Sequence, residues 1–413
     1  LIHRLAEAWN PHASVPPARQ KGGFLLSIPP LLEESSSGAS GAASDHLTDI
    51  AQKTDTRHLA LLAAEQSERK LAIYPASAGF ELVDELDYLA ARSIETNIFF
   101  NPRFLAPAMP RLEDREVRLA VIRDGTEERS RLRLLVPFTI ERPLLPFSVP
   151  VLRTWSNPFG PLGTPLVDYD DPAGVIEDFF AMLARPHLDH PKVFVLPDVG
   201  LDGAFAAILR TVVDARNLPF QITNRIERPT LESALDGDTH HYREFRRLKR
   251  RLGEMGKLDY RIARHPDEVR HGIEAFLTLE ASGWKGRERS AMAIDRYRAA
   301  FAREAVHRLC ERDMCRIHML TLDDAVIACL IVFIENGTAY TWKTAYDEGF
   351  AAYSPGTLLM IEVTKTHLDD PNIIMTDSCA VPDHPVMSRL WSERRPLGTM
   401  VVGLTPDSDR HVR

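Results

Sequence analysis

The sequence predicts an α/β protein made of two similar domains in tandem, preceded by a tail. At 413 residues, the chain is longer than one hydrophobic core normally organises. Helical and strand-like patterns alternate from about residue 71 to the end. Two similar strand pairs, at 117–140 and 315–334, each follow two helices and an aromatic loop, which indicates an internal repeat. We therefore expect a flexible tail at 1–70 and domains at 71–235 and 236–413.

The composition narrows the class of protein. Apolar residues make up 44% of the chain and charged residues 26%, as in globular proteins. The formal net charge of −8 argues against a general nucleic-acid binder, so we expect no DNA partner. Four cysteines provide no disulfide framework, which fits a cytoplasmic location. We expect no membrane span, because no apolar run approaches about 20 residues, and no metal, because the His and Cys spacings suit no metal site.

The first domain shows mixed helical and extended patterns. The tail before it contains a linker-like run of Ser, Gly and Ala and room for a short helix at 59–70. The stretch 144–167 is rich in Pro and Gly, which indicates irregular strands and loops. The expected elements are helices at 80–91, from 102, at 173–184 and at 203–215, a hairpin of strands 117–122 and 132–140, and a strand at 193–196.

The second domain repeats this order with a longer continuation. It opens with a helix at 239–257 that carries six Arg and Lys residues between positions 243 and 251. The elements that follow are a strand at 260–263, a helix at 266–280, a loop at 283–286, a helix at 296–312, a hairpin of strands 315–322 and 326–334, a strand from 340, a helix after 355, a strand at 373–377, a short helix at 385–393 and a strand at 398–403.

The most informative stretch is 338–368, where a strand is followed by a Ser-Pro-Gly turn and a helix. The first N–H groups of a helix lack internal partners, and the helix dipole adds partial positive charge there. We expect a phosphate or diphosphate to bind the N–H groups of Ser354, Gly356, Thr357 and Leu358, with Pro355 stiffening the turn. The alternative is an ordinary strand–helix connection.

The order helix–helix–hairpin–strand–turn–helix–strand resembles that of GNAT-type acetyltransferases. More specifically, several segments resemble the CelD/BioF2-like GNAT group, which pairs two GNAT-like domains and is similar in layout to the FemAB peptidyltransferases. The segments are Phe245-Arg-Arg-Leu-Lys-Arg-Arg, Phe276-Leu-Thr-Leu-Glu, Gly283-Trp-Lys-Gly-Arg, Tyr346-Asp and Tyr353-Ser-Pro-Gly-Thr-Leu-Leu. In place of the usual Gln/Arg-x-x-Gly-x-Gly loop, this sequence has a single glycine, Gly356.

This resemblance implies an acyltransferase that uses acetyl-CoA or another acyl-CoA. The donor would lie beside the Ser-Pro-Gly turn, where two strands separate, and the acceptor would lie between the domains. The acceptor would be an amine or hydroxyl of a sugar, a polysaccharide precursor or another small molecule. Backbone N–H groups at Ala345 and Tyr346 would polarise the thioester carbonyl.

Three side chains are candidates for proton transfer. Asp377 ends an apolar strand and could act as a base, or it could cap a loop or pair with Lys343. Lys343 could meet a carboxylate or an anionic substrate, or simply face solvent. Tyr353 could protonate the departing thiolate, or pack against the helix.

The acceptor candidates are Trp284, Lys285 and Arg287, together with Trp342 on the strand before the turn. An aromatic ring beside two cations suits a sugar or an anionic acceptor, whereas a hydrophobic plug with solvated neighbours is the alternative. The basic run at 243–251 could bind phosphates of CoA, a nucleotide, tRNA or an anionic polymer, or it could be a solvated helix face.

Two other functions stay open on the sequence. One is a FemAB-like transferase that uses aminoacyl-tRNA, with the basic helix as its docking site. The other is a scaffold in polysaccharide assembly without catalysis. A homodimer is also compatible with the sequence.

Overall fold

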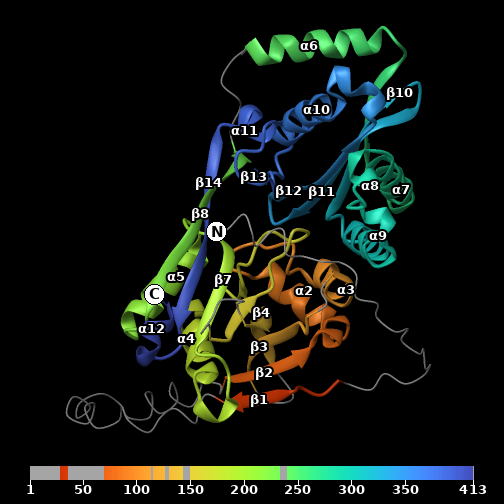
Figure 1. Cartoon of the computed structure of the whole chain (residues 1–413). Helices are drawn as coiled ribbons and strands as arrows, with labels where there is room; N and C mark the ends of the chain where they lie inside the picture. The colour runs from red at the N-terminus through yellow and green to blue at the C-terminus, as the bar shows by residue number, and fades with distance from the viewer. Residues whose placement is uncertain are drawn as a thin grey trace, which may run out of the picture.

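The computed structural model describes residues 28–35, 69–112, 115–125, 130–142, 149–232 and 240–412. Their strands form one continuous mixed sheet in the order β1-β2-β3-β4-β5-β7-β14-β8-β13-β12-β11-β10-β9, with β6 paired to β4. Helices cover both faces of this sheet (Figure 1). The predicted α/β class is therefore confirmed, and two halves lie side by side in one sheet.

The first half follows the predicted order. Its elements are β2 (Lys70–Pro75), α2 (Val83–Ala91), α3 (Pro102–Leu112), β3 (Arg118–Asp124), β4 (Arg131–Glu141), β5 (Val151–Thr154), β6 (Leu166–Val167), α4 (Pro172–Leu183), β7 (Val193–Gly200) and α5 (Ala204–Ala215). Successive strand residues alternate between two cores: Leu119 packs with the core of α2 and α3, and Ala120 packs with that of α4 and α5. Both sheet faces are therefore buried, which explains why these strands are apolar throughout.

The second half repeats this layout. Its elements are α6 (His240–Gly253), β9 (Leu258–Ala263), α7 (Pro266–Ser282), α8 (Trp284–Arg287), α9 (Arg296–Cys310), β10 (Cys315–Leu322), β11 (Ala325–Glu335), β12 (Thr338–Tyr346), α10 (Pro355–Asp369), β13 (Met375–Asp377) and α11 (Met387–Leu390). Short 3₁₀ turns precede α9 and α10. Helices α7 and α9 pack on one face of the sheet, and α10 packs on the other.

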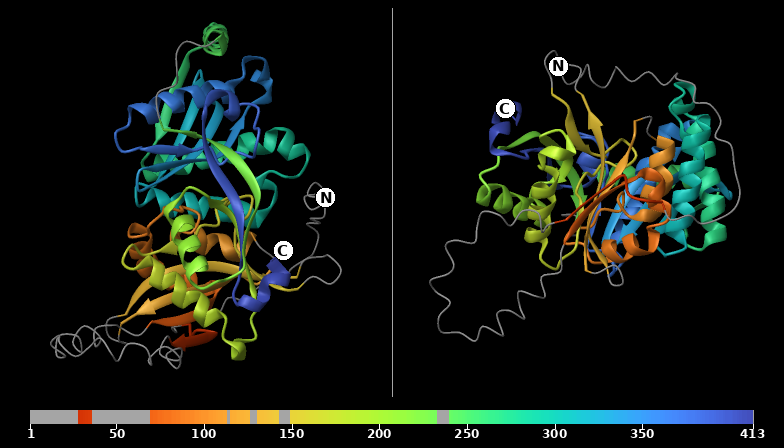
Figure 2. Two further views of the ribbon diagram at one scale, coloured as in Figure 1. Left: turned by 90° about the vertical axis from the view of Figure 1, so that its left-hand side faces the viewer. Right: turned by 90° about the horizontal axis from the view of Figure 1, so that it is seen from below.

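Two long strands join the halves. Strand β8 (Phe220–Leu231) pairs with β13 at its end, and β14 (Glu393–Gly403) lies between β7 and β8. The last strand of the chain therefore completes the sheet of the first half (Figure 2). One aromatic cluster also crosses the junction, since the Phe104 ring of α3 lies 5.2 Å from the Phe301 ring of α9 and 5.8 Å from Trp342.

Several details differ from the sequence prediction. The segment expected as a loop at 283–286 contains the short helix α8, which closes with hydrogen bonds back to Gly283. Strand β8 was not predicted, because its polar residues obscure any alternation. Part of the predicted tail forms strand β1 (Leu32–Ser35), which pairs with β2. Most of the helix expected at 59–70 lies outside the described residues.

Candidate functional site

The candidate site begins where β12 and β13 separate. These parallel strands pair only from Thr338 to Tyr340, opposite Met375 to Asp377, and β12 then continues to Tyr346 without β13 beside it. Strand β13 turns away because the backbone at Cys379 adopts a positive φ of 50°, and its N–H donates to the Asp377 carboxylate at 2.7 Å. The separation of two strands that we expected beside the Ser-Pro-Gly turn is therefore present between β12 and β13.

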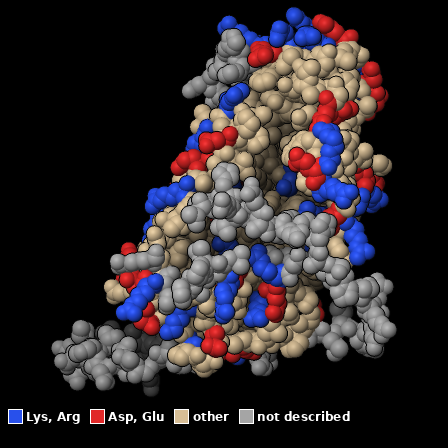
Figure 3. Space-filling model, viewed as in Figure 1, with Lys and Arg blue, Asp and Glu red and all other residues tan. Residues whose placement is uncertain are grey.

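A cavity of about 480 Å³ opens at this gap. The space-filling view is hollowed in the same region, between α11 and α8, with basic side-chain atoms inside the hollow (Figure 3). The cavity reaches from the first turn of α10 to the helical pair α7 and α8. The lining residues are Leu279, Glu280, Gly283, Trp284, Lys285, Thr344, Ala345, Tyr346, Glu348, Ala351, Ser354, Pro355, Gly356, Thr357, Met360, His384, Val386 and Met387.

The first turn of α10 offers fewer N–H groups than predicted. The Ser354 N–H donates to Ala351 O at 3.0 Å, and the Leu358 N–H donates to Ser354 O at 3.0 Å. The Thr357 N–H also donates to the Ser354 oxygen, at 3.0 Å, in an i to i+3 hydrogen bond. Gly356 is the residue whose N–H has no acceptor among the described residues. Leu358 itself is buried in the core and does not line the cavity.

The turn that positions Gly356 is conformationally unusual. Ser354 adopts the left-handed conformation with a φ of 52°, and Pro355 occupies the first helical position, where a missing N–H is harmless. No side chain in the described part of the chain caps this helix start. A Cβ atom at Gly356 would lie 3.3 Å from Cδ1 of Tyr346, so the tyrosine ring stands beside the open amide.

The backbone of β12 presents one amide to the gap. The Asp347 N–H donates to Ile327 O of β11 at 2.8 Å. Successive N–H groups of a strand point to opposite edges, so the Tyr346 N–H points to the edge that β13 has left, and the Ala345 N–H points to β11. Of the two amides expected to polarise a carbonyl, the geometry favours Tyr346.

A β-bulge in β12 determines which side chains share a face. The pairing with β11 shifts register between Ile331 and Val332, and the extra residue in β12 is Trp342. Trp342 and Lys343 therefore both point to the α7 and α9 side. Trp342 is buried, and its Nε1–H donates to Phe159 O of the first half at 2.6 Å. This aromatic core position leaves the Trp342 ring no access to a substrate.

Lys343 lies at the junction of the two halves. Its Nζ donates to Pro158 O at 3.1 Å and lies 4.8 Å from the centre of the Phe159 ring. Burial, followed by the nearby Lys285 ammonium, lowers the pKa of Lys343 to about 8. Among the described residues, no carboxylate oxygen lies within ion-pair distance of this Nζ.

Two acidic residues organise the α7–α8 side of the cavity. Glu280 is buried, and its carboxylate contacts Lys285 Nζ at 2.9 Å and accepts from the Met292 N–H at 2.8 Å. Glu348, from the turn before α10, accepts from the Trp284 N–H at 2.7 Å and pairs with Arg287 at 2.7 Å. Arg287 lies outside the cavity, because this ion pair holds it at the rim.

Trp284 provides an exposed aromatic surface in the wall of the cavity. Its side chain is 47% exposed, in contrast to the buried tryptophans of the core. The Lys285 ammonium lies 6.0 Å from its ring centre. Of the four residues predicted to contact the acceptor, the structure brings Trp284 and Lys285 to the cavity and places Arg287 and Trp342 outside it.

None of the three predicted proton-transfer residues, Asp377, Lys343 and Tyr353, lines the cavity. Asp377 is fully buried, and its carboxylate faces Arg228 at 3.5 Å and Arg395 at 4.0 Å. This arrangement is a buried ion-pair cluster that ties β13 to β8 and β14. Tyr353 packs against the core under α6, with the Arg251 guanidinium 5.7 Å from its ring.

Sequence reasoning missed several lining residues. Glu280, Glu348, Thr344 and Met387 reach the cavity from different elements, and although the first three lie in segments that the sequence had marked, none of the four was singled out there. His384 also lines it, and its Nδ1 accepts from the N–H groups of Val386 and Met387 at 3.3 and 3.2 Å. Burial lowers the pKa of His384, so this imidazole is neutral at pH 7.

The described residues provide neither a metal-binding cluster nor a membrane-crossing helix. No group of three or more His, Cys, Asp or Glu side chains in the described part of the chain is arranged to hold a metal ion. Within the same residues, no helix combines the length and apolar character needed to cross a membrane.

Part of the second half matches a known protein family. Residues 239–370 match the family described as acetyltransferase (GNAT) domain. No curated protein matches the chain. The match covers α6 through α10 and therefore contains the strand, turn and helix of the site.

Similar solved structures span most of the chain. They include L-PGS from Bacillus licheniformis (9% identity, TM-score 0.47, 80% of this chain and 96% of that one) and FemX (10%, 0.49, 79% and 96%). A tandem GNAT protein from the clavulanic acid biosynthesis pathway is similar at 14% identity and a TM-score of 0.39, over 81% and 99% of the two chains. These similarities are too low to indicate a substrate. The family match supports an enzyme of the acyltransferase class, whose GNAT-type domain comprises residues 239–370.

Proposed function

We propose that this protein transfers an acetyl or other acyl group from acyl-CoA to an amine or hydroxyl of a small molecule, such as a sugar or a polysaccharide precursor. One observation carries the proposal. The cavity of about 480 Å³ lies at the separated ends of β12 and β13 and reaches the open amide of Gly356. A thioester held there would lie between a helix start on one side of the sheet and the α7–α8 wall on the other.

The first contact in this mechanism is with the diphosphate of the donor. The Gly356 N–H and the positive end of the α10 dipole would bind it. The Tyr346 N–H, at the open edge of β12, would donate to the thioester oxygen, where negative charge develops during attack. The acceptor atom would approach from the side of Trp284 and Lys285, forming its bond to the acyl carbon as the carbon–sulfur bond breaks. The acceptor loses one proton as the CoA thiolate leaves, so the charges of the reaction balance.

Among the three predicted proton-transfer residues, Lys343 is the one that we propose meets the acceptor. Asp377 is held by two arginines, and Tyr353 packs under α6. Lys343 lies on the α7 and α9 face, next to Lys285 of the cavity wall. Its contacts with Pro158 and Phe159 also support an acceptor site that both halves build, with domains near 71–235 and 236–413.

Calorimetric titration with acetyl-CoA tests the donor. The wild-type protein should bind one molecule per chain, and Gly356→Glu should remove that binding. Gly253→Glu is a matched control, because a Cβ atom at Gly253 meets nothing within 4 Å. Turnover is then measured as CoA thiol released with a panel of amines and amino sugars. A wild-type protein that binds no acyl-CoA contradicts the proposal.

A second candidate function is a FemAB-like transfer from aminoacyl-tRNA. The observation that favours it is helix α6, which carries exposed arginines, including Arg247, Arg250 and Arg251, across the second half. An arginine-rich surface suits a phosphate backbone. Binding of a charged tRNA, without binding of acetyl-CoA, would favour this function, and binding of neither would favour a scaffold in polysaccharide assembly.

A further inference from the structure

A group of basic side chains gathers where the two halves meet, beside the cavity wall that Lys285 lines. Lys343 and Arg298 approach the same ring, Phe159, at 4.8 and 5.5 Å from its centre. Lys285 is close enough to lower the pKa of Lys343 by charge repulsion. Two cations therefore share one aromatic ring of the first half, and a third, Lys285, lies near Lys343.

The acidic side chains near this group already have hydrogen-bond or ion-pair partners. The Glu280 carboxylate contacts Lys285 Nζ at 2.9 Å and accepts a hydrogen bond from the Met292 N–H at 2.8 Å. The Asp295 carboxylate accepts hydrogen bonds from the first N–H groups of α9. It lies 4.0 Å from Nε of Arg298. No described carboxylate is within ion-pair distance of Lys343, whose hydrogen bond goes to a neutral carbonyl, Pro158 O.

The contacts of Lys343 favour its charged form over a neutral amine. A donated hydrogen bond to a carbonyl and a position over an aromatic ring both stabilise an ammonium. With a pKa of about 8, roughly nine-tenths of this side chain is protonated at pH 7. A half-buried cation without an anionic partner is costly unless a ligand supplies the anion.

We infer that the acceptor carries an anionic group, a carboxylate or a phosphate, and that Lys343 is the cation that binds it. This inference rests on the proposed acyl transfer and specifies the class of its acceptor. Lys285 and Arg298 add to the positive potential, and Pro158 and Phe159 of the first half hold Lys343 in place. The nucleophilic amine or hydroxyl of such an acceptor lies toward the cavity, and its anionic group lies toward the junction.

The test measures anion binding directly. Succinate and inorganic phosphate are titrated into wild-type protein saturated with CoA, so that the diphosphate position is occupied, and tryptophan fluorescence reports binding because Trp342 lies beside Lys343. We expect Lys343→Met to weaken binding at least about 10-fold and Lys343→Arg to stay within about 3-fold of wild type. Lys192→Met, a surface lysine of the first half paired with Asp407, should leave binding unchanged.

Turnover with paired acceptors gives a second readout. Glucosamine 6-phosphate and glucosamine differ by one anionic group, and wild type should prefer the phosphate through a lower KM. Lys343→Met should remove that preference with little change in kcat, whereas loss of a general base would lower kcat for both acceptors and would not be restored in Lys343→Arg. Wild-type anion binding should also weaken above pH 8 as Lys343 loses its proton, which requires no variant.

The outcomes separate the two proposals. If wild type binds neither succinate nor phosphate, or if Lys343→Met binds them as well as wild type, the anionic-acceptor inference is wrong. If acetyl-CoA does not bind to wild type, the acyl transfer itself is wrong, and the titration without CoA still decides the role of Lys343.

Discussion

The two halves of this protein contain the same strand–turn–helix unit and use its helix start in opposite ways. Helices α4 and α10 both begin after a left-handed residue, Asp171 with a φ of 50° and Ser354 with a φ of 52°, and each is followed by a proline. At α4, the Asp171 carboxylate accepts from the Gly174 N–H at 3.2 Å and pairs with Arg69 at 2.6 Å. The α4 start therefore carries its own anion.

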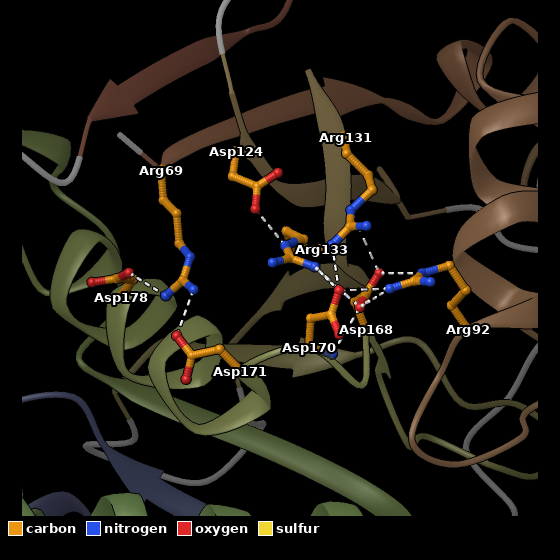
Figure 4. A network of polar contacts seen from close by, with 9 residues as sticks. All are labelled: Arg69, Arg92, Asp124, Arg131, Arg133, Asp168, Asp170, Asp171 and Asp178. Carbon is orange, nitrogen blue, oxygen red and sulfur yellow. Dashed lines mark hydrogen bonds and ion pairs between the residues drawn. The ribbon is translucent and has the colours of Figure 1, made fainter. Parts of the chain in front are cut away.

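The surroundings reinforce this difference. Figure 4 shows the first-half unit filled by arginine–aspartate pairs, in which Arg69 also contacts Asp178 at 2.9 Å and Arg92 contacts the buried Asp168 at 3.0 Å. At α10, no side chain of the described residues caps the helix, and the start opens into a cavity. The comparison shows that one repeat satisfies its helix start internally while the other leaves it available to a ligand.

The largest expected effect comes from closing the open start. Gly356→Glu places a carboxylate in the first turn of α10, two residues after the position that corresponds to Asp171 of α4, and its Cβ would lie 3.3 Å from Cδ1 of the Tyr346 ring. We expect it to weaken acetyl-CoA binding at least about 1,000-fold, since it both fills the space and repels phosphate. Calorimetry measures the change, and unchanged affinity would mean that the α10 start is not the donor site.

The next largest effect is a loss of stability around α10 as the pH falls. Under α10, His367 Nδ1 contacts Thr376 at 2.9 Å, and the Nε2 atoms of His367 and His318 have no hydrogen-bond partner among the described residues. Burial lowers the pKa of His367 to about 4 and the pKa of His318 well below its usual value. Helix α4, by contrast, packs on the apolar side chains of its core.

These histidines bind a proton more readily in the unfolded chain than in the folded protein. Their contribution to the stability of the folded protein is therefore complete above about pH 6.5, where both states are neutral. The free energy of unfolding should fall as the pH drops from 6.5 to 4, by about 3 kcal/mol for His367 alone. Urea titrations of wild type and His367→Leu between pH 4.5 and 7.5 measure this slope, which should be shallower in the variant. Hydrogen exchange in acid should expose α10 before α4, and the reverse order would contradict the assignment.

A smaller effect is expected from opening the filled start. Asp171→Ala removes the cap of α4 and places alanine at a positive φ, so we expect the free energy of unfolding to fall by about 2 kcal/mol. Asp189→Ala is the matched control, since Asp189 has the same φ of 50° and ends a short turn without capping a helix start. Acetyl-CoA should still bind at one site per chain, and a second site in the variant would show that the first repeat retains a donor pocket.

The smallest effect concerns the rim of the open unit. Glu348→Gln keeps an oxygen for the Trp284 N–H and loses the ion pair with the exposed Arg287. We expect the KM for acyl-CoA to rise by no more than about 3-fold with kcat unchanged, because exposed ion pairs contribute little. Glu311→Gln, at the residue that follows α9, is the control, because Glu311 forms an exposed ion pair with His307. A large loss of kcat would instead place Glu348 in the chemistry.

Local sequence predicted the second repeat well, because its signals are short in range. The spacing of apolar residues defined α7, α9 and α10, and the Ser-Pro-Gly turn marked the open helix start. Trp284, Lys285, Tyr346 and Gly356 all line the cavity, as the order of elements suggested.

Contacts between distant segments could not be predicted in the same way. Asp377 was a candidate base, a loop cap or a partner of Lys343, whereas Arg228 and Arg395 come to it from two other strands. Trp342 was assigned to the acceptor site, but the β-bulge and the Phe159 carbonyl place it in the core.

The amino-acid sequence by itself determined the repeated α/β units and the glycine at the α10 start, because periodicity and turn chemistry act over a few residues. The tertiary structure decided which repeat is open, where the last strand inserts, and which charges lack partners. Those outcomes depend on side chains that pair across tens to hundreds of residues, such as Arg69 with Asp171 and Lys343 with Pro158.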